Sequence, residues 1–178
     1  MRKGDYMGLF TPTYYAKSIY DIPANFYKNE GITVIFCDLD NTLDPFFLNE
    51  PSDQAIDLVK ELRENGIEFI ITSNNHGNRV MHYAEKLNVE CHYSSKKPLG
   101  YKLKRFIKRK NFDKNSIVMI GDQILTDVIA SKRTKVRVIL TEPLVKQDLP
   151  ITKINRFFDK KIRKLMKKKL EKREISYE

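Results

Sequence analysis

Two aspartates, Asp38 and Asp40, stand one residue apart at the end of an apolar run in the stretch TVIFCDLDNTL. A carboxylate is costly to bury unless a charge or a hydrogen bond compensates for it. A hydrophobic strand that ends on two carboxylates therefore points to a chemical role for them. In an open parallel sheet, ligands bind at the carboxyl ends of the strands, which is where this pair is expected.

Polar side chains also stand at or just after the ends of three further predicted strands. The second strand ends at Thr72, Ser73 and Asn74, Lys96 and Lys97 come after the third, and the fourth ends at Asp122, with Asp127 one helical turn further on. Because the carboxyl ends of parallel strands meet at one edge of a sheet, we expect these groups to converge on a single rim.

The residue types in this set suit phosphoryl transfer. Magnesium commonly takes one or two carboxylates plus water and substrate phosphate, and Asp38 and Asp122 can supply the carboxylates. A carboxylate is also a competent nucleophile toward phosphorus and forms an aspartyl-phosphate. A second carboxylate two residues on can protonate the departing alcohol and then deprotonate the attacking water. A lysine and a small hydroxyl can hold the phosphoryl oxygens in the transition state.

The elements that position these residues follow from periodicity. Strands are predicted at 32–38, 67–75, 89–94, 115–122 and 135–141, and helices at 51–66, 77–88, 98–111 and 124–134. This alternation favours an α/β fold with a parallel sheet of about five strands, flanked by helices on both faces. We expect the aromatic-rich residues 12–31 to pack over the sheet as a short helix and loop, or to form part of a binding surface. In the helix at 51–66, the expected buried face carries Ala55, Ile56, Val59 and Leu62.

Four short motifs together resemble the haloacid-dehalogenase-like (HAD) phosphatases. The signature of that superfamily is DxDxT, then Ser or Thr followed by Asn, then Lys, then GDxxxxD, and DLDNTL, TSNN, KP and GDQILTDV match it in order. The chain is similar in particular to the YqeG-type group of subfamily IIIA, which is related to phosphatidylglycerophosphate phosphatases. PTYYAKSIYDI, GDQILTDV and ITKINRFFDKKIRK carry this closer likeness, which runs from about Pro12 to Arg163. The resemblance implies a Rossmann-like HAD fold.

The resemblance also implies roles for the residues of the first and last motifs. Asp38 would be the nucleophile and a Mg²⁺ ligand. Asp40 would be the general acid/base and would give its backbone carbonyl to the metal. Thr42 would support the turn and orient the nucleophile, with Asn41 as a further supporting residue. Asp122 would hold the metal.

The remaining matches would handle the phosphoryl group. Ser73 would bind a phosphoryl oxygen, with Asn74 beside it, and Lys97 would neutralise the nucleophile and the transferring group. Asp127 would steady Lys97 or the water shell of the metal. Thr72 could replace Ser73, and Lys96 could replace Lys97, but the Ser-Asn and Lys-Pro spacing of the family favours Ser73 and Lys97.

The intervals between the motifs leave no room for a cap domain. Residues 44–68 are filled by a loop and one helix, and residues 75–96 by a helix and a short strand. We therefore expect a capless, open site, which favours large or surface-bound substrates over small metabolites. The loop after the aspartates carries Phe46, Phe47 and Leu48, which either fold under as core or form an exposed lip at a membrane interface.

Positive charge is concentrated at the C-terminal end. The 178-residue chain has a formal net charge of +10, and +7 of it lies in residues 151–178. A basic amphipathic helix is predicted at 151–173, with an apolar face of Ile154, Phe157, Phe158, Ile162, Leu165 and Leu170. This helix could pack on the domain, lie on an anionic membrane surface, or bind RNA or the ribosome.

Length and composition predict a single domain over residues 1–178, with an aromatic segment at 1–31 and a catalytic core at 32–141. No apolar run approaches the roughly 18 residues that span a bilayer, and YMGLF is too short for a signal-peptide core. We therefore expect a cytoplasmic protein, either free or peripheral at the inner face of the membrane. Cys37 and Cys91 form no CxxC motif and are expected to be free thiols. The oligomeric state is left open.

Three hypotheses about function follow. The first is a Mg²⁺-dependent phosphomonoesterase that forms an aspartyl-phosphate and acts at a membrane surface, with phosphatidylglycerophosphate as the leading substrate. The second is a capless phosphatase for a nucleotide, a nucleic-acid end or a phosphoprotein. The third is an RNA- or ribosome-associated module on a phosphatase fold, and the complete set of motif residues argues against it.

Overall fold

The computed structural model describes residues 8–75, 77–146 and 153–175. Within them the strands are β1 (Tyr14–Ala16), β2 (Val34–Asp38), β3 (Glu68–Thr72), β4 (Glu90–His92), β5 (Ile117–Gly121) and β6 (Arg137–Thr141). The α-helices with defined bounds are α2 (Ala24–Asn29), α3 (Asp53–Glu64), α4 (Asn78–Leu87), α5 (Tyr101–Lys110), α6 (Ile129–Thr134) and α7 (Lys153–Glu171). Three short helical turns are η1 (Ile19–Asp21), η2 (Lys114–Ser116) and the π-helical η3 (Ile124–Val128).

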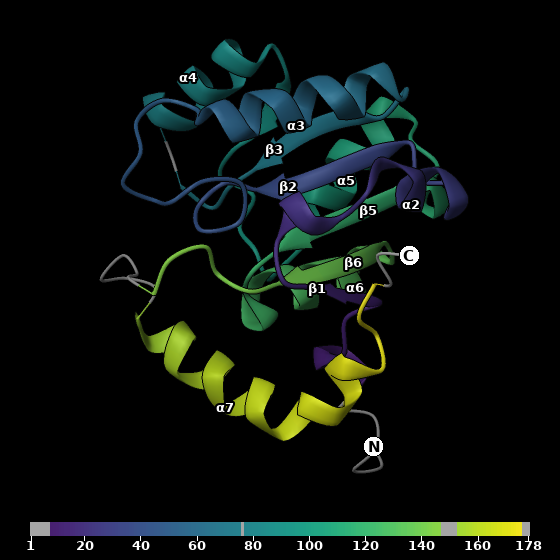
Figure 1. Cartoon of the computed structure of the whole chain (residues 1–178), viewed down its shortest axis with the longest axis vertical. Helices are drawn as coiled ribbons and strands as arrows, with labels where there is room; N and C mark the ends of the chain where they lie inside the picture. The colour runs from purple at the N-terminus through teal and green to yellow at the C-terminus, as the bar shows by residue number, and fades with distance from the viewer. Residues whose placement is uncertain (1–7, 76, 147–152, 176–178) are drawn as a thin grey trace.

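The strands form one parallel sheet in the order β1-β6-β5-β2-β3-β4. The strand β2 lies in the middle, between β5 and β3, so its last residue, Asp38, is flanked by the ends of both neighbours (Figure 1). In the register, Asp38 is paired with Thr72 of β3. The α/β parallel architecture predicted from the sequence is confirmed, and the central strand delivers the first aspartate to the carboxyl edge of the sheet.

Both faces of the sheet are buried, which explains why the strands are apolar throughout. Along β2, Ile35 and Cys37 belong to one hydrophobic cluster, together with buried side chains of α3 and α4. Val34 and Phe36 belong to a second cluster, with side chains of α5, α6 and α7. Alternate residues of one strand thus fill the two cores.

The helix α3 begins where the sequence predicts and differs in its buried face. The Ser52 hydroxyl accepts a hydrogen bond from the Ala55 N–H at 3.1 Å and caps the helix. Ala55, Leu58, Val59 and Leu62 are buried, whereas Ile56, expected on the buried face, is 45% exposed. Three of the four expected residues are therefore buried, and Leu58 is buried in place of Ile56.

The strand β1 is the main departure from the expected topology. The sequence predicted a helix and loop before β2, and α2 fits that prediction, but Tyr14–Ala16 pair in parallel with β6 as a sixth strand. Three residues are too few for periodicity to reveal a strand. The outer edge of β1 bonds in turn to residues 173–175, through Tyr15 N–H to Arg173 carbonyl at 2.8 Å and Ile175 N–H to Tyr15 carbonyl at 2.9 Å.

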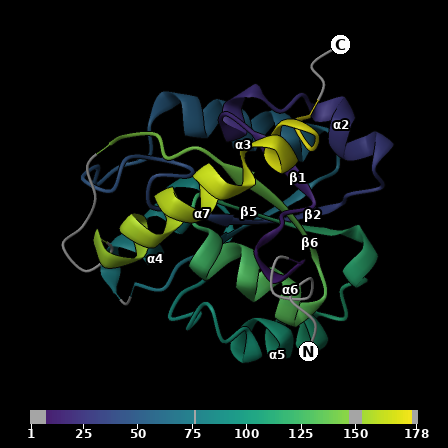
Figure 2. The same cartoon turned by 90° about the horizontal axis from the view of Figure 1, so that it is seen from below.

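The helix α7 runs past the β1 edge of the sheet, and its first half lies beside η3 (Figures 1 and 2). Met166 and Leu170 are buried, but Phe157, Phe158 and Leu165 are at least half exposed, so these three residues of the predicted apolar face do not pack on the domain. The buried face carries Arg156 and Asp159 instead. Of the tail predicted at 151–173, residues 151 and 152 and the side chain of Ile154 lie outside the described part.

No cap domain is inserted within the residues that the structure describes. Between β2 and β3 the chain forms a loop and α3, and between β3 and Lys97 it forms α4 and β4. The edge of the sheet that carries Asp38 is therefore not roofed by a second domain. Among the described helices, none is long and apolar enough to cross a bilayer.

Candidate active site

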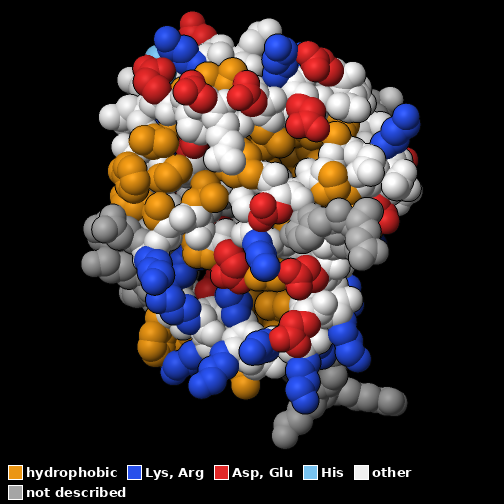
Figure 3. Space-filling model, viewed as in Figure 1, with side chains coloured by type: hydrophobic (Ala, Val, Ile, Leu, Met, Phe, Trp, Pro, Cys, Tyr) orange, Lys and Arg blue, Asp and Glu red, His pale blue; other side chains and the backbone are white. Residues whose placement is uncertain are grey.

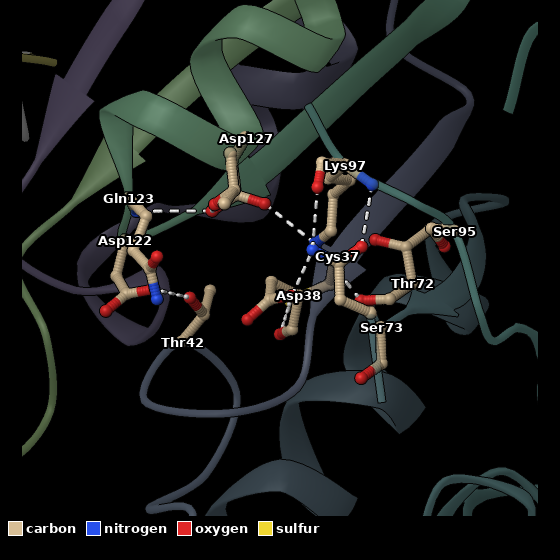
Figure 4. A network of polar contacts seen from close by, with 12 residues as sticks. Cys37, Asp38, Thr42, Thr72, Ser73, Ser95, Lys97, Asp122, Gln123 and Asp127 are labelled. Atoms are coloured by element: carbon tan, nitrogen blue, oxygen red, sulfur yellow. Dashed lines mark hydrogen bonds and ion pairs between the residues drawn. The ribbon is translucent and has the colours of Figure 1, made fainter. Parts of the chain in front are cut away.

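The centre of the site is the buried ammonium of Lys97. Its Nζ donates to an Asp38 carboxylate oxygen, to Asp127 Oδ1 at 2.7 Å and to the Thr72 carbonyl at 3.4 Å (Figure 4). The Lys97 side chain is only 2% exposed. Burial lowers the pKa of Lys97, but the two carboxylates outweigh burial and raise that pKa above its usual value, so the ammonium stays charged. Burial raises the pKa of Asp38, and Lys97 opposes this rise.

The position of Lys97 is set by Asn74, which follows the end of β3. The Lys97 N–H donates to Asn74 Oδ1 at 2.7 Å, and Asn74 Nδ2 donates to the Lys97 carbonyl at 2.9 Å. The preceding residue, Lys96, is exposed. The structure therefore brings Lys97, and not Lys96, to Asp38, and it uses Asn74 to fix the main chain of that lysine.

Two hydroxyls stand at the end of β3 as candidates for binding a phosphoryl oxygen. Ser73 is buried, and its Oγ accepts a hydrogen bond from the Asn75 N–H at 3.1 Å. Thr72 is fully buried, and within the described residues its Oγ1 has no hydrogen-bond partner. Both lie within the group drawn in Figure 4. The preference for Ser73 over Thr72 therefore stays a prediction.

Asp122 directly follows β5 and is fully buried. Thr42 Oγ1 donates to Asp122 Oδ1 at 3.4 Å, so Thr42 contacts the predicted metal ligand, whereas it was expected to orient the nucleophile. Asn41 takes a left-handed conformation (φ 64°), and its N–H donates to the Asp44 carbonyl at 2.7 Å, which turns the chain back after Asp40. Burial raises the pKa of Asp122 to about 6, and Arg156 opposes this rise.

The GDxxxxD motif has a packing reason for its glycine. A Cβ on Gly121 would lie 2.3 Å from Asp127 Cγ, so the Asp127 carboxylate occupies the space that any larger residue would need. Asp127 Oδ2 accepts from the Gln123 N–H at 3.2 Å and from Thr126 Oγ1 at 3.1 Å, while Oδ1 binds Lys97. Of the two roles expected for Asp127, the geometry supports the steadying of Lys97.

Asp40 lies at the open side of this group, with its side chain 17% exposed. Asn75 Nδ2 donates to Asp40 Oδ2 at 2.7 Å, and Arg79 Nη1 donates to Asp40 Oδ1 at 2.6 Å. Arg79 belongs to the first turn of α4, and its Nε also donates to the Leu48 carbonyl at 2.7 Å. Sequence reasoning missed both residues, because the family signature assigns no role to the second asparagine of TSNN, Asn75, and Arg79 lies outside the four motifs.

Three residues of α7 also reach the site and were missed. Arg156, Asp159 and Arg163 contact Asp122 or the turn that follows it. Their spacing places them on one helix face. A signal was present in the sequence, since Asp159 is the single acidic residue between Lys153 and Leu170 in a run otherwise rich in lysine. The hydrophobic periodicity of the helix indicated the opposite face instead.

The fold and this arrangement of charges define a hydrolase of the HAD type, and comparison with known proteins agrees. Residues 47–141 match the family model described as haloacid dehalogenase-like hydrolase. The chain is also 33% identical over 160 residues to the "Probable phosphatase YqeG" of Bacillus subtilis (strain 168), an overlap of 90% of this chain and 93% of that protein. The chain therefore belongs to the haloacid dehalogenase-like hydrolase family.

Solved structures show the same fold at low sequence identity. An uncharacterized protein from Listeria monocytogenes serotype 4b matches with a TM-score of 0.51 at 15% identity, over 67% of this chain and 85% of that one. The cobalt-bound deoxy-D-mannose-octulosonate 8-phosphate phosphatase from Haemophilus influenzae matches with a TM-score of 0.50 at 13% identity, over 79% and 92%. Within its family this chain is a phosphatase, as its motifs predicted, and YqeG is a relative over nearly its whole length.

Proposed function

We propose that this phosphatase hydrolyses phosphomonoesters through an aspartyl-phosphate on Asp38. The observation that carries the proposal is the buried Lys97 ammonium, which bonds the Asp38 carboxylate and is itself held by Asp127. A fixed positive charge beside the nucleophile favours its ionised form. The same charge can stabilise the phosphoryl oxygens as negative charge shifts among them in the transition state.

The reaction takes place in two displacements at phosphorus. In the first, an Asp38 oxygen forms a bond to phosphorus, the bond to the leaving oxygen breaks, and Asp40 donates a proton to that oxygen. In the second, water attacks phosphorus, Asp40 takes its proton, and the bond to Asp38 breaks to release inorganic phosphate. Asn75 and Arg79 hold Asp40 from two sides, so its carboxyl group keeps one orientation for both steps.

The residues present fit a magnesium ion, although carboxylates alone would not hold it. Within the described residues, no group of three or more His, Cys, Asp or Glu side chains could bind a metal by itself. Magnesium needs only one or two carboxylates, because it keeps several waters and binds substrate phosphate. Asp38, Asp122 and the backbone carbonyl of Asp40 would be its protein ligands. When bound, it would supply positive charge to the phosphoryl oxygens.

Crowding of the carboxylates supports a cation at this place. Burial is the largest cause of the raised pKa of Asp38, and the neighbouring charges of Asp127, Asp122 and Asp40 raise it further, against the effect of Lys97. Carboxylates that raise one another's pKa in this way bind a cation favourably, because the cation removes the repulsion.

The surroundings of the site support a lipid phosphate as substrate. Phe157 and Phe158 lie on the face of α7 that turns away from Asp122, and they are 55% and 50% exposed. Phe47, in the loop after Asp40, is 54% exposed. Hydrophobic side chains gather over that loop on the left of Figure 3, and Lys and Arg side chains gather below them, over α7.

Exposed aromatic rings beside lysines suit the surface of an anionic membrane. Lys161 Nζ lies 4.4 Å from the centre of the Phe157 ring, so charge and apolar surface are presented together. The uncapped site leaves room for a substrate that stays in the bilayer. We therefore propose a phosphorylated glycerolipid as substrate, with phosphatidylglycerophosphate as the first candidate.

Phosphate release tests the proposed chemistry. The wild-type protein with Mg²⁺ should release phosphate from phosphatidylglycerophosphate in anionic vesicles faster than from nucleotides, RNA 5′ ends or phosphopeptides. Asp38→Asn should abolish release from every substrate, because it removes the nucleophile. The matched control is Asp57→Asn, which changes the same residue type on the exposed side of α3. Retained turnover in Asp38→Asn would exclude an aspartyl-phosphate on this residue.

Vesicle dependence tests the proposed location. The double change Phe157→Ser and Phe158→Ser should lower the rate on vesicles while leaving the rate on a water-soluble aryl phosphate unchanged. Ile56→Ser removes a similarly exposed apolar side chain from α3 and serves as the control. Equal rates on vesicles for all three proteins would contradict membrane docking through α7. Salt-sensitive RNA binding that is lost on removal of α7 lysines would instead support the RNA alternative.

A further inference from the structure

Side chains of α7 form hydrogen bonds with the main chain of Asp122 and with the main chain of the turn that follows it. Asp159, which is fully buried, accepts hydrogen bonds from the Ile124 N–H at 2.9 Å and the Leu125 N–H at 3.2 Å. Arg163 Nη2 donates to the carbonyls of Asp122 and Thr141, both at 2.7 Å. These main-chain bonds fix the path of the turn independently of the Asp122 side chain.

Arg156 contacts the Asp122 side chain directly. Its Nη2 lies 2.5 Å from Asp122 Oδ2, and its Nη1 donates to the Asp122 carbonyl at 3.3 Å. The two side chains are 7% and 0% exposed. A buried carboxylate without a counter-charge is strongly unfavourable, so the guanidinium neutralises Asp122 when no metal is present. The other carboxylate oxygen, Oδ1, faces Thr42 of the first motif.

Arg156 lies outside the part of the chain that the family model matches, as Asp38 and Asp40 also do. The family model matches residues 47–141 and so ends before α7 begins. The helix nevertheless places a cation on a predicted metal ligand, and it does so from the β1 side of the sheet (Figure 2). The active site of this chain is therefore completed by its C-terminal helix.

We propose that Arg156 is a positioning residue that orients the Asp122 carboxylate and lowers the affinity of the site for Mg²⁺. This inference rests on the proposed role of Asp122 as a metal ligand. Two effects of the guanidinium oppose each other. It orients the carboxylate for a cation, but it also repels that cation and removes part of the charge that would attract it. The repulsion dominates, because Asp159 and Arg163 already fix the turn.

The direct test is a titration of the metal-free protein with Mg²⁺, in which calorimetry measures the affinity. Thermal unfolding with and without Mg²⁺ measures the stability. Arg156→Met and Arg156→Gln remove the charge, and Gln keeps a hydrogen-bond donor. Both should bind Mg²⁺ more tightly, on the order of tenfold. Both should melt earlier than wild type in EDTA, because Asp122 loses the counter-charge that contacts its carboxylate, and should recover most of the loss in saturating Mg²⁺.

The control is Lys160→Met, which removes one positive charge from an exposed position of the same helix. It should bind Mg²⁺ as wild type does, which would exclude a general effect of net charge. Mg²⁺ affinity that is unchanged or weaker in both Arg156 variants, with their circular dichroism intact, overturns the inference. Asp122→Asn distinguishes the underlying assumption: if this variant still binds Mg²⁺ like wild type, Asp122 is not a ligand and the proposed metal site itself fails.

Discussion

The side-chain amide of Asn74 and the main chain of Lys97 form a pair of hydrogen bonds, at 2.7 and 2.9 Å, between residues 23 positions apart in sequence. One bond uses the amide oxygen and the other uses the amide nitrogen. The lysine that bonds Asp38 is thus located by a residue from the neighbouring strand end. This relationship ties the second motif to the third and makes Asn74 part of the positioning of the catalytic charge.

Loss of that pair should slow catalysis. Asn74→Ala should lower kcat toward an aryl phosphate by about tenfold or more, because Lys97 loses the restraint on its main chain. Asn74→Asp should also be impaired, since a carboxylate cannot donate to the Lys97 carbonyl. Gln54→Ala, which removes an exposed amide from α3, is the control. Wild-type kcat in both Asn74 variants would mean that the pair has no part in placing Lys97.

The contact between Arg79 and Asp40 should matter most for poor leaving groups. Arg79→Met removes a hydrogen bond of 2.6 Å to the proposed general acid. We expect a loss of about tenfold in kcat for an alkyl phosphate, whose departing oxygen needs a proton, and a much smaller loss for an aryl phosphate. Steady-state kinetics on the two substrates measures the difference.

Arg63→Met is the control for that experiment. Arg63, like Arg79, donates two hydrogen bonds, here to the main-chain carbonyls of Leu87 and Asn88. It lies on α3, away from the site. An equal loss on both substrates in Arg79→Met would indicate a general structural effect rather than a role in positioning the acid.

The close contact between Gly121 and Asp127 predicts that even a methyl group is harmful. Gly121→Ala should destabilise the fold by about 1–3 kcal/mol, because the new Cβ would lie 2.3 Å from Asp127 Cγ. It should also lower kcat, since displacement of Asp127 frees Lys97 on one side. Denaturant unfolding and kinetics measure the two effects. Gly8→Ala, where an added Cβ meets nothing within 4 Å, should be neutral in both.

Asp159 should make the stability of the metal-free protein depend on pH. Burial raises the pKa of Asp159 from 3.8 to about 6, against the hydrogen bonds and arginines that lower it. The folded state binds the proton of the Asp159 carboxyl group more tightly than the unfolded state does. The resulting contribution to the free energy of unfolding is about 3 kcal/mol, is fully present below about pH 4, and is lost as the pH rises to about 6.

Asp159→Asn should remove that contribution. Unfolding curves in EDTA between pH 4 and pH 6.5 should show a smaller fall in stability for the variant than for wild type. Asp57→Asn, at an exposed position, should keep the wild-type slope. Burial also raises the pKa of Asp122 to about 6, so the slope of stability against pH is compared between the variant and wild type. Identical slopes for wild type and Asp159→Asn would show that Asp159 titrates alike in both states.

The parts of the site that belong to motifs were predictable, because a parallel sheet brings the carboxyl ends of its strands to one edge. That rule brings Asp38 of β2, Asp122 after β5 and the residues after β3 to one place, and the contacts of Lys97 agree with it. The Lys-Pro spacing of the family favoured Lys97 over Lys96, and the structure confirmed the side-chain direction, which composition does not reveal. Lys97 is buried and Lys96 is exposed.

The orientation of α7 was not predictable from hydrophobic periodicity. The pattern placed Phe157, Phe158 and Leu165 on one apolar face, but it could not tell whether that face packs on the domain, and all three are exposed. The helix buries Arg156 and Asp159 instead, because each meets a partner at Asp122 or the turn after it. Burial of a charge depends on a compensating group, and here that group lies more than 30 residues away in the chain.

The sequence by itself determined the parallel sheet, the family and the set of motif residues, since these follow from local periodicity and from short patterns with a known order. The pairing of Lys97 with Asp38 and Asp127 was already implied by the family resemblance. Only the tertiary structure decided that Arg79 neutralises Asp40 and that Arg156 neutralises Asp122. The physical reason is that electrostatic compensation is a property of distance and burial. Neither quantity is encoded at any single position of the chain.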